Sequence, residues 1–249
     1  MPPTSRWSAW RNPRACWIEW RAAVSPSRGE AEVVLSGATA AYDGKPVLFG
    51  VDLTIRAGER VALMGRSGAG KSTLLGLVHA QARARVALIP QAAALVRTLS
   101  VFHNVYMGRL DRRSTLHNLR TLAFPARDDL AEVSGILGEV GLADAVRAKA
   151  GALSGGQQQR VSVARALYNG RPILIGDEPV SALDRRQGGL ILERMAARHQ
   201  TLVLALHDIA LALAHTDRIV VLDAGRIVLD APARDLDEAA LVPFYGQAA

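Results

Sequence analysis

The chain has 249 residues, of which 49% are apolar and 21% are charged, so it contains enough apolar sequence to bury a substantial core. No uninterrupted apolar run is long enough to cross a bilayer, and the sequence begins without the apolar segment of a secretory signal. The single cysteine, Cys16, excludes a disulfide framework and indicates a reducing compartment; the net charge of +7 comes from scattered arginines, so we expect no nucleic-acid partner.

Residues 1–30 differ in composition from the rest of the chain, and we expect them to form a disordered extension. They are rich in arginine, proline and serine and contain all four tryptophans: Trp7, Trp10, Trp17 and Trp20. The alternative is a membrane-interface helix, because spacings of 3, 7 and 3 residues place the indole rings on one side of a helix. Pro13 would interrupt that helix.

From residue 32 the sequence becomes regular, and two strand-like runs over residues 32–40 and 47–55 predict a β-hairpin. The segment between them, residues 43–46, contains glycine and proline and predicts the turn. Tyr42 stands at the end of the first strand, about two dozen residues before the next motif. Such an aromatic is either a half-buried strand residue or a ligand contact, and its position alone does not decide between them.

A complete phosphate-binding loop of the form G-x-x-x-x-G-K-S follows the hairpin. It consists of Gly65, Arg66, Ser67, Gly68, Ala69, Gly70, Lys71 and Ser72. Its glycines allow the backbone amides to approach phosphate oxygens, Lys71 adds a positive charge, and Ser72 offers a hydroxyl to Mg²⁺. An apolar strand over residues 60–64 precedes the loop and a helix begins near Gly70, which is the context that this motif requires.

The middle of the chain predicts one strand followed by a mainly helical region. The strand covers residues 85–89 and ends at Pro90 and Gln91. We then expect a helix over residues 100–108 with Ser100 as its N-cap, a basic and irregular stretch over 110–127, and an amphipathic helix over 128–140.

Two further motifs lie in the second half of the chain. The run Leu153, Ser154, Gly155, Gly156 and Gln157 opens a helix that extends toward Asn169. The apolar strand over residues 173–178 then ends in two carboxylates, Asp177 and Glu178. In a phosphate-loop protein, the first of these is well placed to hold Mg²⁺ and the second to orient an attacking water.

The remaining elements predict an α/β fold with a mostly parallel sheet. A helix over residues 185–199 precedes a strand over 201–205, and His207 lies just past that strand. Two final strands, over residues 218–222 and 226–229, flank a turn. Ligands in such sheets bind at the carboxyl ends of the strands, so we expect the phosphate loop, the carboxylate pair and His207 to meet at one edge.

Taken together, these motifs resemble the nucleotide-binding subunit of ATP-binding cassette (ABC) transporters, and the resemblance covers roughly residues 32–230. The phosphate loop is shared by many ATPases, but the motif at residues 153–157, placed ahead of the carboxylate strand, is typical of the cassettes. The resemblance implies a cassette domain over residues 31–249 that has a P-loop core, an N-terminal antiparallel β subdomain and a helical subdomain over about 92–165.

The resemblance also assigns the nucleotide contacts. Within one subunit they are Tyr42, which would stack on adenine, and the phosphate-binding residues Gly65, Arg66, Ser67, Gly68, Ala69, Gly70, Lys71, Ser72 and Thr73. Across a head-to-tail dimer, the contacts to the nucleotide of the other subunit are Ser154, Gly155, Gly156, Gln157 and the D-loop residue Asp184.

The same resemblance assigns the catalytic groups and the metal ligands. Mg²⁺ would be held near Ser72, Gln91 and Asp177. Glu178 would polarise the attacking water, and His207 would contact the γ-phosphate. Gln91, the Q-loop glutamine, would also lie near the membrane partner. ATP and Mg²⁺ are therefore the expected substrate and metal ion.

The sequence most resembles cassettes of the phosphonate-import type, particularly in the run Gly108, Arg109 and Leu110. One feature departs from the family: Gln91 follows Lys71 by only 20 positions, which is markedly short. We expect the antiparallel subdomain to be shortened there.

The expected function is that of an importer ATPase. It would act as a dimer at the cytoplasmic face of the inner membrane, bound to integral-membrane permease subunits and served indirectly by an exported solute-binding protein. The expected cargo is a phosphonate or a related oxyanion. The alternatives are an importer for phosphate, an amino acid or a metal, a soluble cassette ATPase without transport, and a degenerate copy that binds nucleotide without hydrolysing it.

Overall fold

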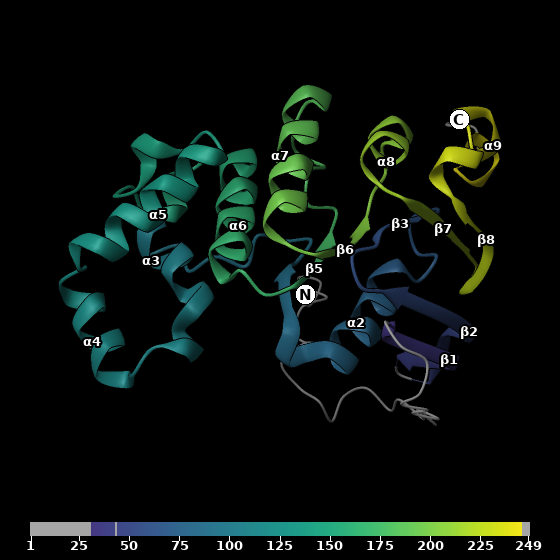
Figure 1. Cartoon of the computed structure of the whole chain (residues 1–249), viewed down its shortest axis with the longest axis horizontal. Coiled ribbons are helices and arrows are strands. Elements are labelled where there is room, and N and C mark those ends of the chain that lie inside the picture. Colours follow the sequence, from purple (N-terminus) through teal and green to yellow (C-terminus); the bar gives the residue numbers. More distant parts are fainter. Residues whose placement is uncertain (1–30, 43, 246–249) are drawn as a thin grey trace, which may run out of the picture. The chain divides into compact units, whose positions relative to one another are not determined.

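The computed structural model describes residues 31–42 and 44–245, and these form two compact units (Figure 1). The first unit contains residues up to Ala84 together with the chain from His207 onward, and the second runs from Arg85 to Leu206. The predicted extension over residues 1–30 lies outside the described residues.

The structure confirms the predicted hairpin, which is the first described element of the first unit. Strands β1 (Ala31–Tyr42) and β2 (Lys45–Arg56) pair in antiparallel fashion. Along β2, Val51, Leu53 and Ile55 are buried, which is the period-two pattern of a strand with one face against a core. These two strands are the only members of their sheet among the described residues.

The first unit also carries the strand that precedes the phosphate loop. Strand β3 (Arg60–Met64) pairs in parallel with β7 (Arg218–Asp223), and β7 pairs in antiparallel fashion with β8 (Arg226–Pro232). In its described residues this unit has the helices α2 (Lys71–Ala82), α8 (Ile209–His215) and the short α9 (Glu238–Leu241), which a 3₁₀ turn (Val242–Phe244) follows. The strands and helices predicted here are present.

The second unit contains three parallel strands, as the sequence predicted. Strand β5 (Ile173–Asp177) pairs with β4 (Val86–Ile89) on one side and with β6 (Thr201–Ala205) on the other. Every residue of β5 and β6 is buried, which explains why their sequences are nearly continuous apolar runs. Helix α7 (Arg185–Arg198) connects these two strands.

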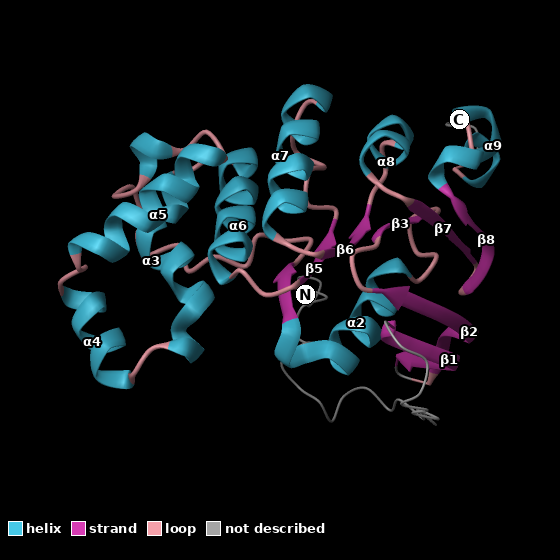
Figure 2. Cartoon of the chain, in the orientation of Figure 1, coloured by secondary structure: helices cyan, strands magenta, loops and turns pink. Residues whose placement is uncertain are grey.

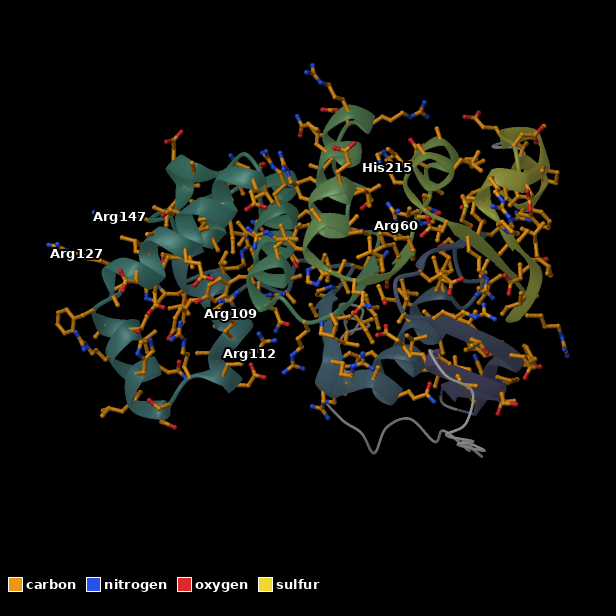
Figure 3. All side chains as sticks on the ribbon, in the orientation of Figure 1. Arg60, Arg109, Arg112, Arg127, Arg147 and His215 are labelled. Atoms are coloured by element: carbon orange, nitrogen blue, oxygen red, sulfur yellow. The ribbon has the colours of Figure 1, made fainter. Side chains whose placement is uncertain are left out.

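Between β4 and β5 the second unit consists of helices joined by loops and contains no strand (Figure 2). Its helices are α3 (Val101–Tyr106), α4 (Thr115–Ala123), α5 (Arg127–Glu139) and α6 (Gly155–Asn169), with shorter 3₁₀ turns between them. Tyr106 and Tyr168 meet in its core with ring centroids 6.3 Å apart. The guanidinium of Arg109, labelled in Figure 3, lies over the ring of Tyr168 at 4.2 Å.

The prediction of an irregular stretch over residues 110–127 was wrong, because this stretch contains α4. Ser114 is the N-cap of the helix, and its hydroxyl accepts a hydrogen bond from the backbone N–H of His117 at 3.2 Å. The arginines and the proline around the segment concealed a helix of only nine residues.

No helix among the described residues is long and apolar enough to cross a membrane.

The segment between the phosphate loop and Gln91 is short in the structure as well. Helix α2 ends at Ala82, a single 3₁₀ turn (Arg83–Arg85) follows, and β4 begins at Val86. The chain therefore passes from helix to strand without any further strand that could join β1 and β2.

A buried histidine in the second unit makes the stability of the fold depend on pH. The Nδ1 atom of His199 lies 2.6 Å from the carbonyl oxygen of Arg171, and its Nε2 is buried without a hydrogen-bond partner among the described residues. Nδ1 must therefore carry the proton that is donated to the carbonyl. Burial lowers the pKa of His199, because the charged imidazolium would lose its hydration.

We expect the free energy of unfolding to fall as the pH drops below about 6.5. In that range the unfolded chain takes up a proton at His199 that the folded chain does not, so protonation favours unfolding. Between pH 7.5 and pH 5.5 the loss should be about 1 kcal/mol greater for the parent than for His199→Asn, which cannot become charged. Urea unfolding at the two pH values measures this difference, and equal losses would contradict it.

Candidate functional site

The phosphate loop lies between β3 and α2, and its backbone conformation requires glycine at two positions. Gly65 has a φ of +128°, and a Cβ atom there would lie 2.1 Å from the carbonyl oxygen of Leu222. Gly70 has a φ of +106°, and a Cβ atom there would lie 2.8 Å from the side chain of Leu48. The loop can therefore turn tightly into the helix only with these glycines.

Lys71 is buried, and its ammonium group is held inside the loop. Its Nζ donates hydrogen bonds to the carbonyl oxygens of Gly65 at 2.7 Å and of Arg66 at 3.1 Å. Ser72 and Thr73 follow in the first turn of α2, where both are partly exposed. A positive charge, a helix N-terminus and a glycine-rich loop together form an anion site suited to phosphate groups.

The turn between β7 and β8 supports the loop from the same unit. The N–H of Gly225 donates to the carbonyl oxygen of Ala69 at 3.1 Å, and the N–H of Phe49 donates to the carbonyl oxygen of Gly225 at 3.0 Å. Gly225 thus links the loop to β2. It has a φ of +79°, and a Cβ atom there would lie 2.2 Å from the carbonyl oxygen of Val47.

We expect Gly225→Ala to lower the free energy of unfolding by at least about 2 kcal/mol, because it adds a backbone clash to an unfavourable φ. The matched control is Gly58→Ala, since Gly58 has a φ of +81° but a Cβ atom there would meet no other atom within 4 Å. That variant should lose only about 1 kcal/mol. Urea unfolding of both variants measures the difference, and equal losses would exclude a role for the contact with Val47.

His207 and the phosphate loop share a neighbour, Tyr245. The hydroxyl of Tyr245 accepts a hydrogen bond from the N–H of Gly65 at 3.4 Å, and its ring centroid lies 6.4 Å from that of His207 in an edge-to-face arrangement. Burial raises the pKa of Tyr245 to about 12, so the hydroxyl stays protonated at neutral pH. The sequence did not suggest Tyr245, because it follows Gly65 by 180 positions and belongs to no motif.

His207 itself is exposed and precedes α8. The next residue, Asp208, caps that helix by accepting a hydrogen bond from the N–H of Leu211 at 3.0 Å. The cap fixes the backbone immediately after His207. Tyr42 ends β1 opposite Lys45, and its side chain lies outside the described part of the chain.

In the second unit, Gln91 and Asp177 emerge at the same edge of the sheet. Ile89 of β4 lies opposite Gly176 of β5 in a parallel register. Asp177 is the last residue of β5, and Gln91 lies two residues after the end of β4. Asp177 is buried, whereas Gln91 is exposed. This edge is where ligands bind in parallel α/β sheets.

The backbone of Glu178 is held in an unusual conformation by several hydrogen bonds. Its φ is +55°, which a residue with a side chain rarely adopts. Its N–H donates to Ala205 at 3.1 Å, and its carbonyl oxygen accepts from the side chain of Gln159 at 3.3 Å and from the hydroxyl of Ser181 at 3.1 Å. A strained backbone held by its surroundings is typical of functional sites.

The motif at residues 153–157 begins α6 with a capping box. The N–H of Ser154 donates to the side-chain oxygen of Gln157 at 2.9 Å, and the N–H of Gln157 donates to the hydroxyl oxygen of Ser154 at 3.3 Å. The Ser154 hydroxyl accepts in this cap, so its own hydrogen remains available for donation. A Cβ atom at Gly156 would lie 3.3 Å from the carbonyl oxygen of Ala182.

Helix α7 begins shortly after Glu178, and the segment before it contacts the start of α6. Asp184 caps this helix by accepting a hydrogen bond from the N–H of Gln187 at 2.9 Å. Through Gly156 and Gln159, the first turns of α6 contact the segment that runs from Glu178 to Ala182. Within the second unit, the motif at residues 153–157 therefore lies beside the segment that follows Asp177 and leads to Asp184.

Each unit contains oxygen donors of the kinds that Mg²⁺ takes when it binds together with phosphate groups. Mg²⁺ takes few protein ligands in such sites and completes its shell with water and phosphate oxygens. Ser72 supplies a hydroxyl in the first unit, and Gln91 and Asp177 supply an amide oxygen and a carboxylate in the second. No group of three or more His, Cys, Asp or Glu residues in the described part of the chain forms a metal site of its own.

The fold and the phosphate loop define this chain as a P-loop nucleotide-binding protein. The profile of the family described as "ABC transporter" matches residues 48–82 and 77–181. The chain therefore belongs to the ABC transporter family, as its ATP-binding cassette. The two matched segments meet at residues 77–82, inside the short stretch between Lys71 and Gln91.

Several curated relatives carry the name "Phosphonates import ATP-binding protein PhnC". The protein from Pseudomonas putida is 37% identical over 86% of this chain and 90% of its own length. The protein from Pseudomonas entomophila is 39% identical over 80% of this chain and 85% of its own length. The protein from Anaeromyxobacter dehalogenans is 37% identical over 87% of this chain, but this chain spans only 49% of that protein.

Solved structures agree with the family assignment. The dimeric structure of MJ0796, described as a bacterial ABC transporter cassette, is 26% identical, with a TM-score of 0.71 over 81% of this chain and 98% of that one. A post-hydrolysis dimer of the same cassette bound to ADP and phosphate is 27% identical, with a TM-score of 0.68 and the same coverage.

Proposed function

We propose that this chain is the ATP-hydrolysing subunit of an ABC importer that takes up phosphonates. The observation that carries the proposal is the phosphate loop, in which glycine is required at residues 65 and 70 and the ammonium of Lys71 is buried. The names of the curated relatives support phosphonate as the cargo class. The 37–39% identity extends over most of this chain, far beyond the shared ATPase motifs.

The phosphate loop binds ATP in this proposal. Backbone N–H groups of the loop after Gly65, through residue 73, and the ammonium of Lys71 surround the phosphates, and Tyr42 stacks on the adenine. The hydroxyl of Tyr245 accepts the hydrogen bond of the Gly65 N–H, which is the first amide of the loop. The support for this arrangement is the loop conformation and the anion site that it forms.

Ser72, Gln91 and Asp177 hold the magnesium ion, which neutralises phosphate charge when it is bound. Glu178 orients the attacking water and accepts its proton. Hydrogen bonds fix the backbone of Glu178 and therefore the position of its Cβ atom. His207 donates a hydrogen bond toward the γ-phosphate. Phosphoryl transfer depends mainly on positioning and charge neutralisation, which these groups provide.

A second copy of the chain completes the site. Ser154, Gly155, Gly156 and Gln157, with Asp184 of the D-loop, contact the nucleotide of the other copy. The free hydrogen of the Ser154 hydroxyl and the N-terminal turn of α6 suit a phosphate oxygen. Two structures of one related cassette, MJ0796, are dimeric, which supports this arrangement.

The dimer works at the cytoplasmic face of the inner membrane, bound to permease subunits that an exported binding protein supplies with cargo. The helical subdomain over about residues 92–165 and Gln91 face the permease in this arrangement. ATP-driven closure of the dimer and its reopening after hydrolysis change the access state of the permease.

Growth on different phosphorus sources tests the cargo. We expect deletion of the gene to abolish growth of the source organism on an alkylphosphonate as the sole phosphorus source, while growth on inorganic phosphate is unchanged. The parent gene should restore growth, and a Glu178→Gln copy should not. Growth of the deletion strain on the phosphonate, or failure only on phosphate, an amino acid or a metal-limited medium, would reject phosphonate as the cargo.

A further inference from the structure

Helix α4 in the second unit presents its apolar side to solvent. Leu116, Leu119 and Leu122 are 79%, 61% and 55% exposed, and Phe124, just past the end of the helix, is 77% exposed. Leu116, Leu119 and Ala123 are spaced three and four residues apart, so they form one continuous side of the helix. This short helix thus exposes its three leucines and the adjacent Phe124 together, and we call these four side chains the α4 ridge.

The polar side of the same helix is packed against the protein. Thr121 is buried, and the Nε2 atom of His117 lies 3.1 Å from a carboxylate oxygen of Asp129. The side-chain oxygen of Asn118 accepts a hydrogen bond from the hydroxyl of Tyr106 at 3.0 Å, and its amide donates to the carbonyl oxygen of Leu110 at 2.9 Å. An ordinary surface helix has the opposite orientation. These polar contacts hold the α4 ridge outward.

Basic residues flank the α4 ridge in the sequence, and the exposed acidic residue Asp128 follows them at the start of α5. Residues 110–127 contain four arginines and one acidic residue, Asp111, which is paired with Arg171. Arg113 is paired with Asp129, whereas Arg112, Arg120 and Arg127 form no ion pair with any described residue. In Figure 3 the side chain of Arg127 points away from the ribbon at the start of α5. The exposed surface at α4 is therefore both apolar and cationic.

We propose that the α4 ridge docks onto an anionic phospholipid surface. Short basic amphipathic helices bind membranes by placing leucine and phenylalanine side chains at the boundary of the acyl chains and arginines among the headgroup phosphates. The α4 ridge has both components. Arg120 is exposed within the helix, and the exposed residues Arg112 and Arg127 precede and follow it in the sequence.

The shape of the surface favours lipid over a folded protein partner. Leu116 and Phe124 each expose more than three quarters of their surface, so they project instead of lining a groove. A protein partner would need an apolar groove bordered by acidic groups at matching positions, whereas a bilayer accepts projecting side chains anywhere on its surface.

Vesicle flotation with the full chain tests the proposal. The parent should bind vesicles of phosphatidylcholine mixed with phosphatidylglycerol, bind pure phosphatidylcholine weakly, and dissociate as salt is raised. The double variant Leu116→Ser/Leu119→Ser should lower the partition coefficient about tenfold or more. Arg112→Gln/Arg120→Gln/Arg127→Gln should remove the preference for the anionic lipid. Leu190→Ser, which changes an exposed leucine on α7, is the matched control and should bind like the parent.

A local probe separates α4 from any other part of the chain that touches lipid. In a Cys16→Ser background, an environment-sensitive dye at Leu119→Cys should shift to the blue with anionic vesicles, and the same dye at Leu190→Cys should not. Unchanged binding by the double leucine variant, or no shift at position 119, would overturn the proposal. Failure of the parent to bind vesicles, together with loss of permease association by the leucine variant, would identify a protein-docking surface instead and also overturn it.

Discussion

Glu178→Gln is expected to bind ATP as the parent does while hydrolysing it at least about 100-fold more slowly. The amide has nearly the same shape as the carboxylate but cannot accept a proton from the attacking water. The backbone at residue 178 is fixed by its bonds to Ala205, Gln159 and Ser181, so the substitution should leave the loop in place. Phosphate release measures hydrolysis, and the fluorescence of a labelled ATP analogue measures binding.

Glu193→Gln is the matched control for this prediction. Glu193 is exposed on α7, in the same unit as Glu178 but outside every motif, so its variant should hydrolyse ATP at the parental rate. Parental turnover by Glu178→Gln would remove Glu178 from the proposed role. A loss of ATP binding by Glu178→Gln would show instead that the substitution disturbs the site as a whole.

The second large effect is expected for Lys71→Met, which should weaken ATP binding about 100-fold or more. The substitution removes a buried positive charge that lies within the loop and leaves an apolar side chain of similar length. Charge-assisted hydrogen bonds to phosphate contribute about 1.5–3 kcal/mol each, so the loss of two such bonds weakens binding about 100-fold or more. Titration of the labelled ATP analogue measures the dissociation constant.

Lys149→Met provides the control, since Lys149 is an exposed lysine in the second unit and belongs to no nucleotide motif. It should bind ATP as the parent does. Unfolding in urea shows whether Lys71→Met remains folded. Parental affinity in a folded Lys71→Met variant would be inconsistent with a phosphate site built around the Lys71 ammonium.

Most of the fold could be predicted because its signals are local. The run of apolar residues in β5 and the glycines before α2 each indicate their structure within a few residues. The candidate site could be predicted for the same reason, since the phosphate loop, residues 153–157 and the Asp177–Glu178 pair are contiguous motifs. Their order along the chain then indicated the family, which the match to the family profile confirmed.

The features that the sequence did not predict depend on distant contacts. Helix α4 turns its leucines outward, and only the bonds of Asn118 and His117 to Tyr106 and Asp129 explain that orientation. Tyr245 reaches Gly65 across 180 positions, and no pattern connects two such residues. The left-handed conformation of Glu178 likewise follows from its hydrogen bonds and not from its residue type.

The short connection between α2 and β4 is the feature that most directly affects the proposed function. It leaves the 3₁₀ turn Arg83–Arg85 as the only element between the phosphate-loop helix and the strand that leads to Gln91. The residues that we propose to bind ATP flank this connection and lie outside it. We therefore expect ATP binding to be retained, and any cost of the short segment to appear in coupling to the permease.

Mg²⁺-dependent ATP hydrolysis by the purified full chain, followed together with its oligomeric state, tests the central claim most directly. The parent should release phosphate only when Mg²⁺ is present. Glu178→Gln should accumulate as a dimer when ATP is added and return to monomer when ATP is removed. A parent chain that binds ATP but neither hydrolyses it nor dimerises, with or without its permease, would contradict the proposed function and indicate a cassette that binds nucleotide without turning it over.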